Sequence, residues 1–259
     1  MLFWKLVVVS FRSQLQYPAS FLMLALAHFI STFVDVIGIW ILFDRFNFIQ
    51  GWTLFEIGLS YGAIQMGFAL AESFARGFDT FSQMVKQGDF DRVLLRPINP
   101  FLQMASREVQ LLRVGRFLQG LTILIISASE LSLPLFSSHF LVIILSILGT
   151  ACLFYGLFVI QATISFWTIE TLELMNITTY GGLQLGQYPM SIYKKPIRLI
   201  FTLVIPLACT AYYPIATLLR KEPLPLSLGL IAPLAGALFL YLAYLLWRLG
   251  VRHYSSTGS

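Results

Sequence analysis

The sequence predicts an all-α membrane protein with six transmembrane helices, and three observations lead to this prediction. First, 58% of the 259 residues are hydrophobic and only 11% are charged, whereas charged residues make up about 25% of a typical soluble domain. Second, the mean hydropathy of the chain is +0.79. Third, six apolar runs each reach the length of about 20 residues that a helix needs to cross a bilayer. The segments between them are too short for a soluble domain of ordinary size.

The distribution of Lys and Arg residues sets the expected orientation of the six spans, which are 19–43, 53–77, 117–136, 140–167, 197–219 and 226–247. With a cytoplasmic N-terminus, 14 of the 17 basic residues fall inside, and seven of these lie between Arg76 and Arg116. Because basic residues are enriched in cytoplasmic loops, both termini are expected to be cytoplasmic. The inner residues include Lys194, Lys195 and Arg198, and the outer ones are Arg45, Arg220 and Lys221. The net charge of +5 therefore indicates contact with anionic membrane lipid, not with nucleic acid.

Residues 1–18 are predicted to form an amphipathic helix that lies flat on the inner leaflet before the first span. Lys5, Arg12 and Gln16 fall on one helical stripe, and Trp4 is suited to the membrane interface. Pro18 then ends this helix and turns the chain into the membrane. Residues 19–259 are expected to form the six-span domain.

Small residues recur at every fourth position in the second span. They are Ala63, Gly67, Ala71 and Ala75. Such a stripe lets the backbone of another helix approach closely, which is how helices associate in lipid. The partner helix could belong to the same subunit or to another one.

The polar stretch after the second span, about 79–100, is predicted to contain two short helices. Asp79 can cap the first helix, and Gly88 can end it in the left-handed conformation. Asp89 can cap a second helix over residues 90–95, which Pro97 stops. Two readings remain open: a docking element for a partner, or a solvated loop that carries positive charge.

The segment from Ile169 to Lys195, with Glu170 and Glu173, is expected to lie along the inner membrane interface before the fifth span. Within that span, Pro206 and Pro214 each remove a backbone donor. The fifth span is therefore predicted to be bent or broken near the outer leaflet.

Few ionisable side chains lie inside the predicted spans: His28, Asp35 and Glu72, with Gln65 as a neutral companion. A charge at the centre of a bilayer costs about 2.5–3.5 kcal/mol, so these side chains should face protein or water. Glu72 could pair with Arg76, four residues later on the same helix. Each of these residues is a candidate either for a structural pair or for a transport pathway.

Several catalytic and metal-binding classes find no support in the sequence. It contains no G-x-x-x-x-G-K-[ST] motif, so ATP binding through a P-loop is excluded. Residues 58–62 match G-x-S-x-G, but a match inside a transmembrane helix lacks the strand–turn–helix setting of a hydrolase. No cluster of acidic, His or Cys residues has the spacing of metal ligands. Cys152 and Cys209 are interpreted as apolar packing residues.

Two segments resemble a known family. The segment 87–97, with the sequence QGDFDRVLLRP, resembles the G-x-[LF]-D-x-x-L-x-[RK]-P signature of a six-helix subfamily of type-2 ATP-binding-cassette (ABC) exporter permeases. Tyr188-Pro189 and Tyr193, followed by Val204-Ile205-Pro206 and Tyr213-Pro214, are similar to a second signature of that subfamily. The likeness covers nearly the whole chain.

This resemblance implies a dimer of permease subunits, homomeric or with a related permease, that works with two cytoplasmic ABC ATPase subunits. The ATPase would bind ATP and Mg, so the permease would need no cofactor and would not be an enzyme. The complex would lie in the cytoplasmic membrane of a bacterium and move its substrate outward. The coupling helix that docks on the ATPase would comprise Gly88, Asp89, Phe90, Asp91, Arg92, Leu95, Arg96 and Pro97.

Two other functions are alternatives to export. An ion-coupled secondary transporter could use Asp35 and Glu72 as ion sites, but it would be expected to have broken helices in two matching halves. An intramembrane enzyme would need a nucleophile, base or metal set, which the sequence lacks. On the export reading, His28, Asp35, Gln65, Glu72 and Pro206 are candidates for the substrate path or the subunit seam.

Overall fold

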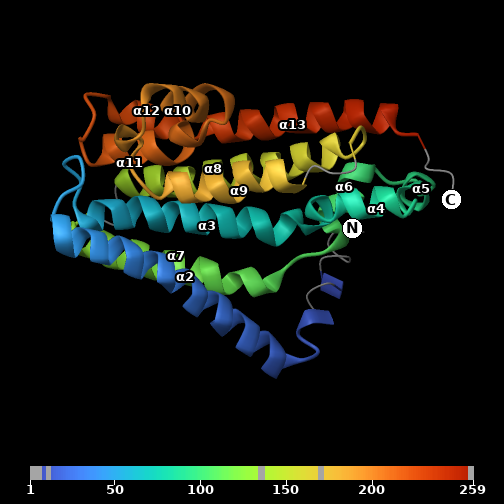
Figure 1. The fold of residues 1–259 in the computed structure, drawn as a ribbon, viewed down its shortest axis with the longest axis horizontal. Coiled ribbons are helices and arrows are strands. Elements are labelled where there is room, and N and C mark those ends of the chain that lie inside the picture. The colour runs from blue at the N-terminus through green and yellow to red at the C-terminus, as the bar shows by residue number, and fades with distance from the viewer. Residues whose placement is uncertain (1–7, 10–12, 134–137, 169–171, 256–259) are drawn as a thin grey trace.

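The computed structural model describes residues 8–9, 13–133, 138–168 and 172–255. Within these ranges the protein is helical and contains no β-strand, apart from one isolated bridge between Ile49 and Trp52. Figure 1 shows the long helices running together along the longest axis of the molecule. The all-α fold expected from the sequence is confirmed.

Five helical segments are long and apolar enough to cross a bilayer, counted over the described ranges, and one bent pair of helices would add a sixth. They contain α2 (Pro18–Phe46), α3 (Leu54–Asp79), α7 (Val114–Glu130), α8 (Ser138–Ile164), and α12 (Leu226–Ile231) followed by α13 (Leu234–His253). These helices confirm the first four predicted spans and the sixth. The predicted fifth span, 197–219, corresponds to the bent pair, which is described below.

The predicted interfacial helix falls mostly on residues 1–7 and 10–12, which lie outside the described residues. Gln14 belongs to its described part and is tied to the loop before α7. The backbone N–H of Leu111 donates to the Gln14 carbonyl oxygen at 2.9 Å, and the Gln14 amide donates to the carbonyl of Val109. Glu170 and the side chain of Glu173 also lie outside the described part of the chain.

The central helix α3 packs closely against α7 on one side and α8 on the other. A Cβ added at Gly67 would lie 2.7 Å from the Cβ of Thr150 on α8, and one at Gly62 would lie 2.7 Å from the carbonyl oxygen of Gly120 on α7. Glycine therefore lets these backbones approach each other. The small-residue stripe is a contact within one chain, and the G-x-S-x-G match at 58–62 contributes packing glycines to the same helix.

The helix α9 (Leu172–Gly186) runs antiparallel to α3. The Tyr180 hydroxyl donates to Glu72, whereas Gly186 lies against Ile64, eight residues earlier on α3. Because α3 runs toward the end with α4 (Phe81–Lys86), α9 leads away from that end (Figure 1). The expectation that residues 169–195 follow the inner interface is therefore wrong for α9, which itself passes back through the bundle.

A bent pair of helical segments follows α9. Its first arm is α10 (Lys195–Leu199) with the π-helical turn η3 (Ile200–Val204), and its second arm is the π-helical turn η4 (Ala208–Tyr212) with α11 (Tyr213–Leu218). The two arms meet at an angle of 85° around Pro206. Pro206 has no backbone N–H and cannot continue the helical bonding, so the break predicted from the prolines is confirmed.

Contacts at the far end of the bundle place the second arm beside the start of α3. Lys221 pairs with Glu56 at 2.8 Å, and Glu56 also forms a capping box with Thr53 at the start of α3. Tyr212 donates to Glu222 at 2.9 Å, and its ring lies 5.8 Å from that of Trp52. This end is opposite to α4 and α5 (Phe90–Leu94) in Figure 1.

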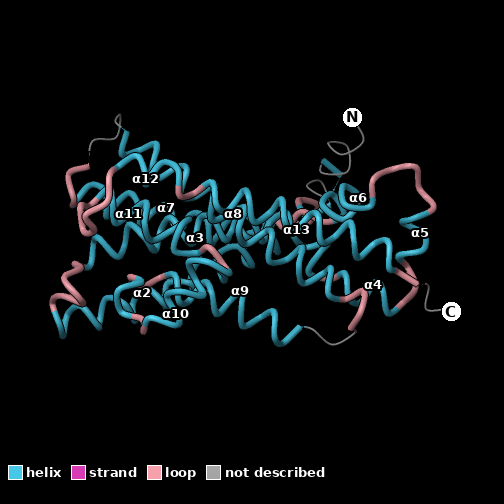
Figure 2. The backbone as a smooth tube through the Cα atoms, turned by 90° about the horizontal axis from the view of Figure 1, so that it is seen from above, coloured by secondary structure: helices cyan, strands magenta, loops and turns pink. Residues whose placement is uncertain are grey.

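The placement of α10 changes the charge map drawn from the sequence. Lys194, Lys195 and Arg198 follow α9 and belong to the half of the bundle away from α5 (Figures 1 and 2). Their assignment to the inner side is therefore wrong. Of the 15 described Lys and Arg residues, nine remain toward the α5 end and six lie toward the other. The basic bias toward the α5 end persists but is weaker.

Candidate functional site

The helices α4 and α5 form a hairpin at one end of the bundle, joined at Gly88. Gly88 has a φ of +71°, and the N–H groups of Gly88 and Asp89 donate to carbonyls in the last turn of α4. This left-handed glycine ends α4 as predicted. The predicted capping roles of two aspartates are wrong: Asp79 is the last residue of α3, and Asp89 makes no capping bond but pairs with Arg92 at 3.2 Å.

An aromatic cluster holds α5 against the bundle. Phe90 is completely buried, and its ring centroid lies 5.0 Å from Phe81, 5.6 Å from Phe166 and 6.3 Å from Trp247. These partners come from α4, from the segment after α8 and from α13. Phe90 is therefore an anchor, and its assignment to a partner-binding surface is wrong.

The opposite side of α5 faces away from the bundle and forms an exposed ridge. We define this α5 ridge as Arg92, Leu95 and Arg96; the side chain of Arg92 is 82% exposed, and Leu95 is 85% exposed. Pro97 is exposed next to it. A groove beside the ridge includes Gln14, Asp89 and Glu108 in its lining. The ridge thus combines two cations with an apolar side chain on a rigidly held turn.

Asp91 points to the C-terminal segment instead of joining the ridge. Its carboxylate lies beside the hydroxyl of Tyr254, and burial together with this neighbouring carboxylate raises the pKa of Tyr254 to about 12. The Tyr254 ring also packs on Phe90, with centroids 5.0 Å apart. Asp91 therefore sits where it can position α5 against the C-terminal segment.

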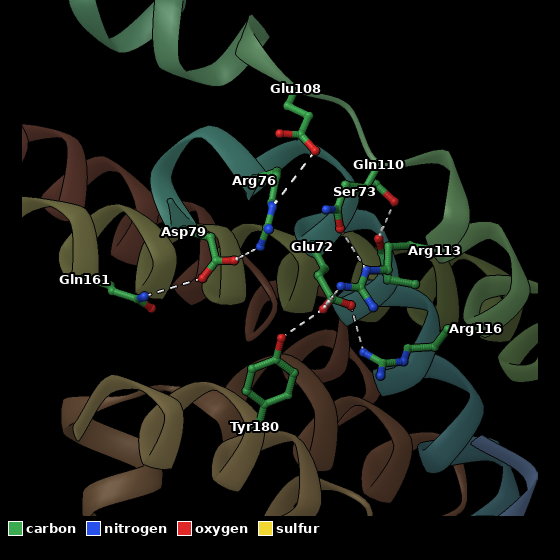
Figure 3. Close-up of polar contacts among 11 residues, drawn as sticks. Glu72, Ser73, Arg76, Asp79, Glu108, Gln110, Arg113, Arg116, Gln161 and Tyr180 are labelled. Carbon is green, nitrogen blue, oxygen red and sulfur yellow. Dashed lines mark hydrogen bonds and ion pairs between the residues drawn. The ribbon is translucent and has the colours of Figure 1, made fainter. Parts of the chain in front are cut away.

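A charged network lies inside the bundle, next to the α4–α5 hairpin (Figure 3). Glu72 on α3 is almost fully buried and pairs with Arg113 at 3.0 Å and with Arg116 at 2.8 Å. Tyr180 on α9 donates to the same carboxylate at 3.0 Å. The network therefore ties together α3, the start of α7 and α9. The predicted pair of Glu72 with Arg76 is wrong.

Arg76 belongs to a second set of contacts beside this network. Arg76 forms an ion pair with Asp79 at 2.6 Å and lies 4.0 Å from Glu108 (Figure 3). Asp79 in turn accepts a hydrogen bond of 3.4 Å from Gln161 on α8. The backbone N–H of Gln110 donates to the carbonyl of Ser73 at 2.9 Å. The last two turns of α3 are therefore bonded to α8 and to the segment before α7, just before the chain enters α4.

Neutral polar side chains continue inward from the network along α3 and α7. Gln119 donates to the Tyr61 hydroxyl at 2.9 Å, and Tyr61 donates to the carbonyl of Thr32 on α2 at 3.3 Å. Gln65 is buried beside them, and the carbonyl oxygens of Gln65 and Gln119 have no hydrogen-bond partner. Two buried acceptors without donors therefore lie at this level.

The remaining pathway candidates lie on α2 and at the bend. His28 and Asp35 are half-buried, seven residues apart on one side of α2. His28 lies near Glu72 and its two arginines, and Asp35 lies near Tyr61 and Tyr188. The structure gives Asp35 no ion pair within the described residues. Pro206 lies at the bend between the two arms that follow α9.

Sequence reasoning missed the partners of Glu72. Arg113 and Arg116 were counted only as loop charge, and Tyr180 was placed in an interfacial segment. One signal was available, because Arg113 and Arg116 are three residues apart and Gln119 follows at the same spacing. Residues three apart share a helix face, so this polar stripe predicts a side of α7 that turns toward protein.

Comparison with known proteins identifies the family. The family model described as "ABC-2 family transporter protein" matches residues 29–258, which include the greater part of α2, all the other long helices and both charged regions. The chain belongs to the ABC-2 transporter family. Neither the curated proteins nor the solved structures contain a match to this ABC-2 protein. As a multi-pass member of the family, it is the membrane component of a transporter and is not itself catalytic.

Proposed function

We propose that this protein is the permease subunit of an ABC exporter whose ATPase is a separate polypeptide. The observation that carries the proposal is the α5 ridge: Arg92, Leu95 and Arg96 project from a short helix that is fixed to the bundle through the buried Phe90. Exposed cations around one apolar side chain suit a groove with acidic and apolar groups on a protein partner. The ATPase would bind ATP and Mg and dock on this ridge from the cytoplasm.

The aromatic cluster connects the docking ridge on α5 to the transmembrane helices. Phe81 and Phe90 both contact Trp247 on α13, and Phe78 at the end of α3 contacts the same ring at 5.2 Å. Interiors packed at this density transmit displacement instead of absorbing it. A shift of α5 on ATP binding would therefore move α3 and α13 together, as a two-state rearrangement biased by the nucleotide.

Export also requires a path, which we place on the side of the bundle formed by α2, α9 and α10. Figure 2 shows these three helices along the same edge of the molecule. His28 and Asp35 lie on α2, within electrostatic range of the Glu72 network and of Tyr188. A second permease subunit, identical or related, would close this side, with substrate passing between the subunits toward the outside of the cytoplasmic membrane.

The ion-coupled alternative fits this geometry less well. An ion site needs a carboxylate that can exchange partners, whereas Glu72 is already held by two arginines and one tyrosine. Among the described residues no cluster of three His, Cys, Asp or Glu could hold a metal ion. Of the two predicted ion sites, Asp35 has no ion pair within the described residues.

The proposal is tested with permease in lipid nanodiscs and its cognate ABC ATPase, by measuring binding and ATP turnover. The double variant Arg92→Glu/Leu95→Asp should lose ATPase binding and the permease-dependent part of ATP turnover. Arg252→Glu, an exposed cation at the same end of the molecule, should retain both. Unchanged binding by the double variant would place the docking surface elsewhere.

A further inference from the structure

An apolar pocket lies between α2, α3 and α7 in the half of the bundle away from α5. Its volume is about 340 Å³, which is more than twice the roughly 150 Å³ of a cavity that binds one benzene molecule. None of the lining residues is charged, and Glu56 on the same stretch of α3 pairs with Lys221 instead. The pocket therefore has room for an apolar group larger than a single aromatic side chain.

The pocket begins where α2 and α7 separate. The two helices first pack closely, because a Cβ added at Gly115 would lie 3.2 Å from the backbone nitrogen of Phe29. One turn further along both helices, the Gln119 amide donates to the carbonyl of Thr32 at 3.4 Å. Beyond this level the side chains of α2 and α7 line the pocket, and the stretch Leu54 to Tyr61 of α3 completes the lining. Helix packing thus leaves a gap that no side chain of these three helices fills.

The depth of the pocket places it among the acyl chains of a bilayer. The charged residues that end the apolar surface come later on both helices, with Asp44 and Arg45 on α2 and Glu130 on α7. The exposed side chains of α2 between the pocket and Asp44 are apolar, namely Ile41 and Leu42. The open side of the pocket therefore meets hydrocarbon and not water.

This open side faces away from the polar residues of α2. Phe33, Ile37 and Trp40 line the pocket and are four and three residues apart, so they share one helix face. Asp35 is two residues from both Phe33 and Ile37, which is slightly more than half a helical turn, so it projects from the other side. Ile37 is 51% exposed and Trp40 is 54% exposed. The pocket therefore opens toward lipid and not toward the side where we place the second permease subunit.

The hydroxyl groups in the lining offer little to a polar occupant. Tyr61 donates to the carbonyl of Thr32 at 3.3 Å and accepts from Gln119, and Thr122 donates to the carbonyl of Leu118 at 2.8 Å. A bound water needs two to four polar partners, so water gains little in this pocket. An empty pocket would forfeit the dispersion contacts of its lining. An alkyl chain supplies those contacts and needs no hydrogen bond.

We propose that this pocket binds one acyl chain of a membrane phospholipid, which remains with the protein as a resident ligand. The chain fills the gap between α2 and α7 beyond their contact at Gly115 and packs on the start of α3. The site does not depend on the proposed permease function, because it uses only the packing of three helices and the lipid around them.

The site is tested with the full-length protein in bilayers of phosphatidylcholine that carries a photo-reactive diazirine on one acyl chain. After irradiation, mass spectrometry maps the labelled residues, and the label should reach the stretch Leu54 to Tyr61 of α3. The variant Ile126→Trp, which fills the pocket, should lose this α3 label. Ile125→Trp is the matched control and should keep it, because Ile125 is 57% exposed and Ile126 is 51% exposed, but only Ile126 lines the pocket.

A second pair of variants repeats the comparison on α2. Ile37→Trp should lose the α3 label, whereas Ile41→Trp should keep it, because Ile41 is similarly exposed but does not line the pocket. Thermal unfolding identifies any variant that fails to fold, and the pair on the other helix then decides. A label confined to the outward faces of α2 and α7, or an α3 label that persists in a folded pocket variant, would overturn the site. A disulfide that joins two subunits through Ile37→Cys would also overturn it, because a second copy of the chain would then cover the pocket.

Discussion

The carboxylate of Glu72 on α3 lies 2.8 Å from the guanidinium of Arg116 on α7, although the two residues are 44 positions apart in the chain. With Arg113 and Tyr180, this contact fixes three helices to one another just before α3 enters the α4–α5 hairpin. The three helices beside the hairpin are therefore held together by ion pairs and a hydrogen bond as well as by packing. A movement of the hairpin must act on these contacts.

Replacing Glu72 by Gln should destabilise the protein strongly. The change leaves two arginines buried without a counter-charge, and breaking a buried pair in this way costs about 3–5 kcal/mol. Thermal unfolding in nanodiscs should show a clearly lower midpoint. Glu108→Gln is the matched control, because the Glu108 side chain is 50% exposed and lies 4.0 Å from Arg76. A Glu72→Gln variant as stable as the control would show that the network carries little of the fold.

Substitutions at Phe90 and Leu95 should distinguish the anchoring of α5 to the bundle from the docking of the ATPase on α5. Phe90→Ala removes a completely buried ring from the aromatic cluster, and such truncations cost about 3–5 kcal/mol. Leu95→Ala removes an exposed side chain, so it should leave the unfolding midpoint unchanged while weakening ATPase binding. The two variants are compared by thermal unfolding and by ATPase binding in parallel. Loss of stability in Leu95→Ala would contradict the assignment of the ridge as a free surface.

Gly77→Ala should disturb the junction of α3 with α6 (Pro100–Arg107). A Cβ at Gly77 would lie 2.0 Å from the carbonyl oxygen of Met104, so the backbone of α6 must move. Overpacking of this kind costs about 1–3 kcal/mol. Gly38→Ala is the control, because nothing lies within 4 Å of a Cβ there. It should leave stability unchanged or raise it by up to about 1 kcal/mol. Equal stability of the two variants would show that the junction is loosely packed.

The fold places Lys194 in the half of the bundle away from α5, which is the outer half when α5 faces the cytoplasm as proposed, and labelling can check this placement. Single cysteines are introduced at Lys194, Arg45 and His253 in a background that lacks Cys152 and Cys209. A membrane-impermeant maleimide applied to intact cells should label positions 45 and 194, and label position 253 only after permeabilisation. Labelling of position 194 only from the cytoplasm would restore the arrangement first inferred from the sequence and contradict the placement of α10 in the half of the bundle away from α5.

Patterns that repeat along one helix could be predicted from the sequence. The apolar runs gave five of the spans, because length and hydropathy are local properties. The stripe containing Gly67, the left-handed Gly88 and the break at Pro206 were also predicted, since each depends on the residue's own backbone chemistry. These features position the α5 hairpin, but they do not reveal which side of it is exposed.

Contacts between distant segments could not be predicted in the same way. Arg76 is four residues from Glu72, and this spacing predicted that the two would pair. In the structure Arg76 pairs with Asp79 instead. The helix α9 was missed because its 15 residues are too few for a standard span and include Asn176, Thr178 and Thr179. The burial of Phe90 likewise depends on Phe166 and Trp247, which follow it by many residues.

The most direct test of the central claim is cross-linking from the α5 ridge to the ATPase. A photo-reactive phenylalanine analogue is placed at Leu95, and a matched one at Phe48, which is exposed at the opposite end of the bundle. In membranes containing both proteins, irradiation should join the ATPase to position 95 and not to position 48. An ATPase that is fully stimulated by the position-95 variant but yields no cross-link there would contradict docking on the α5 ridge.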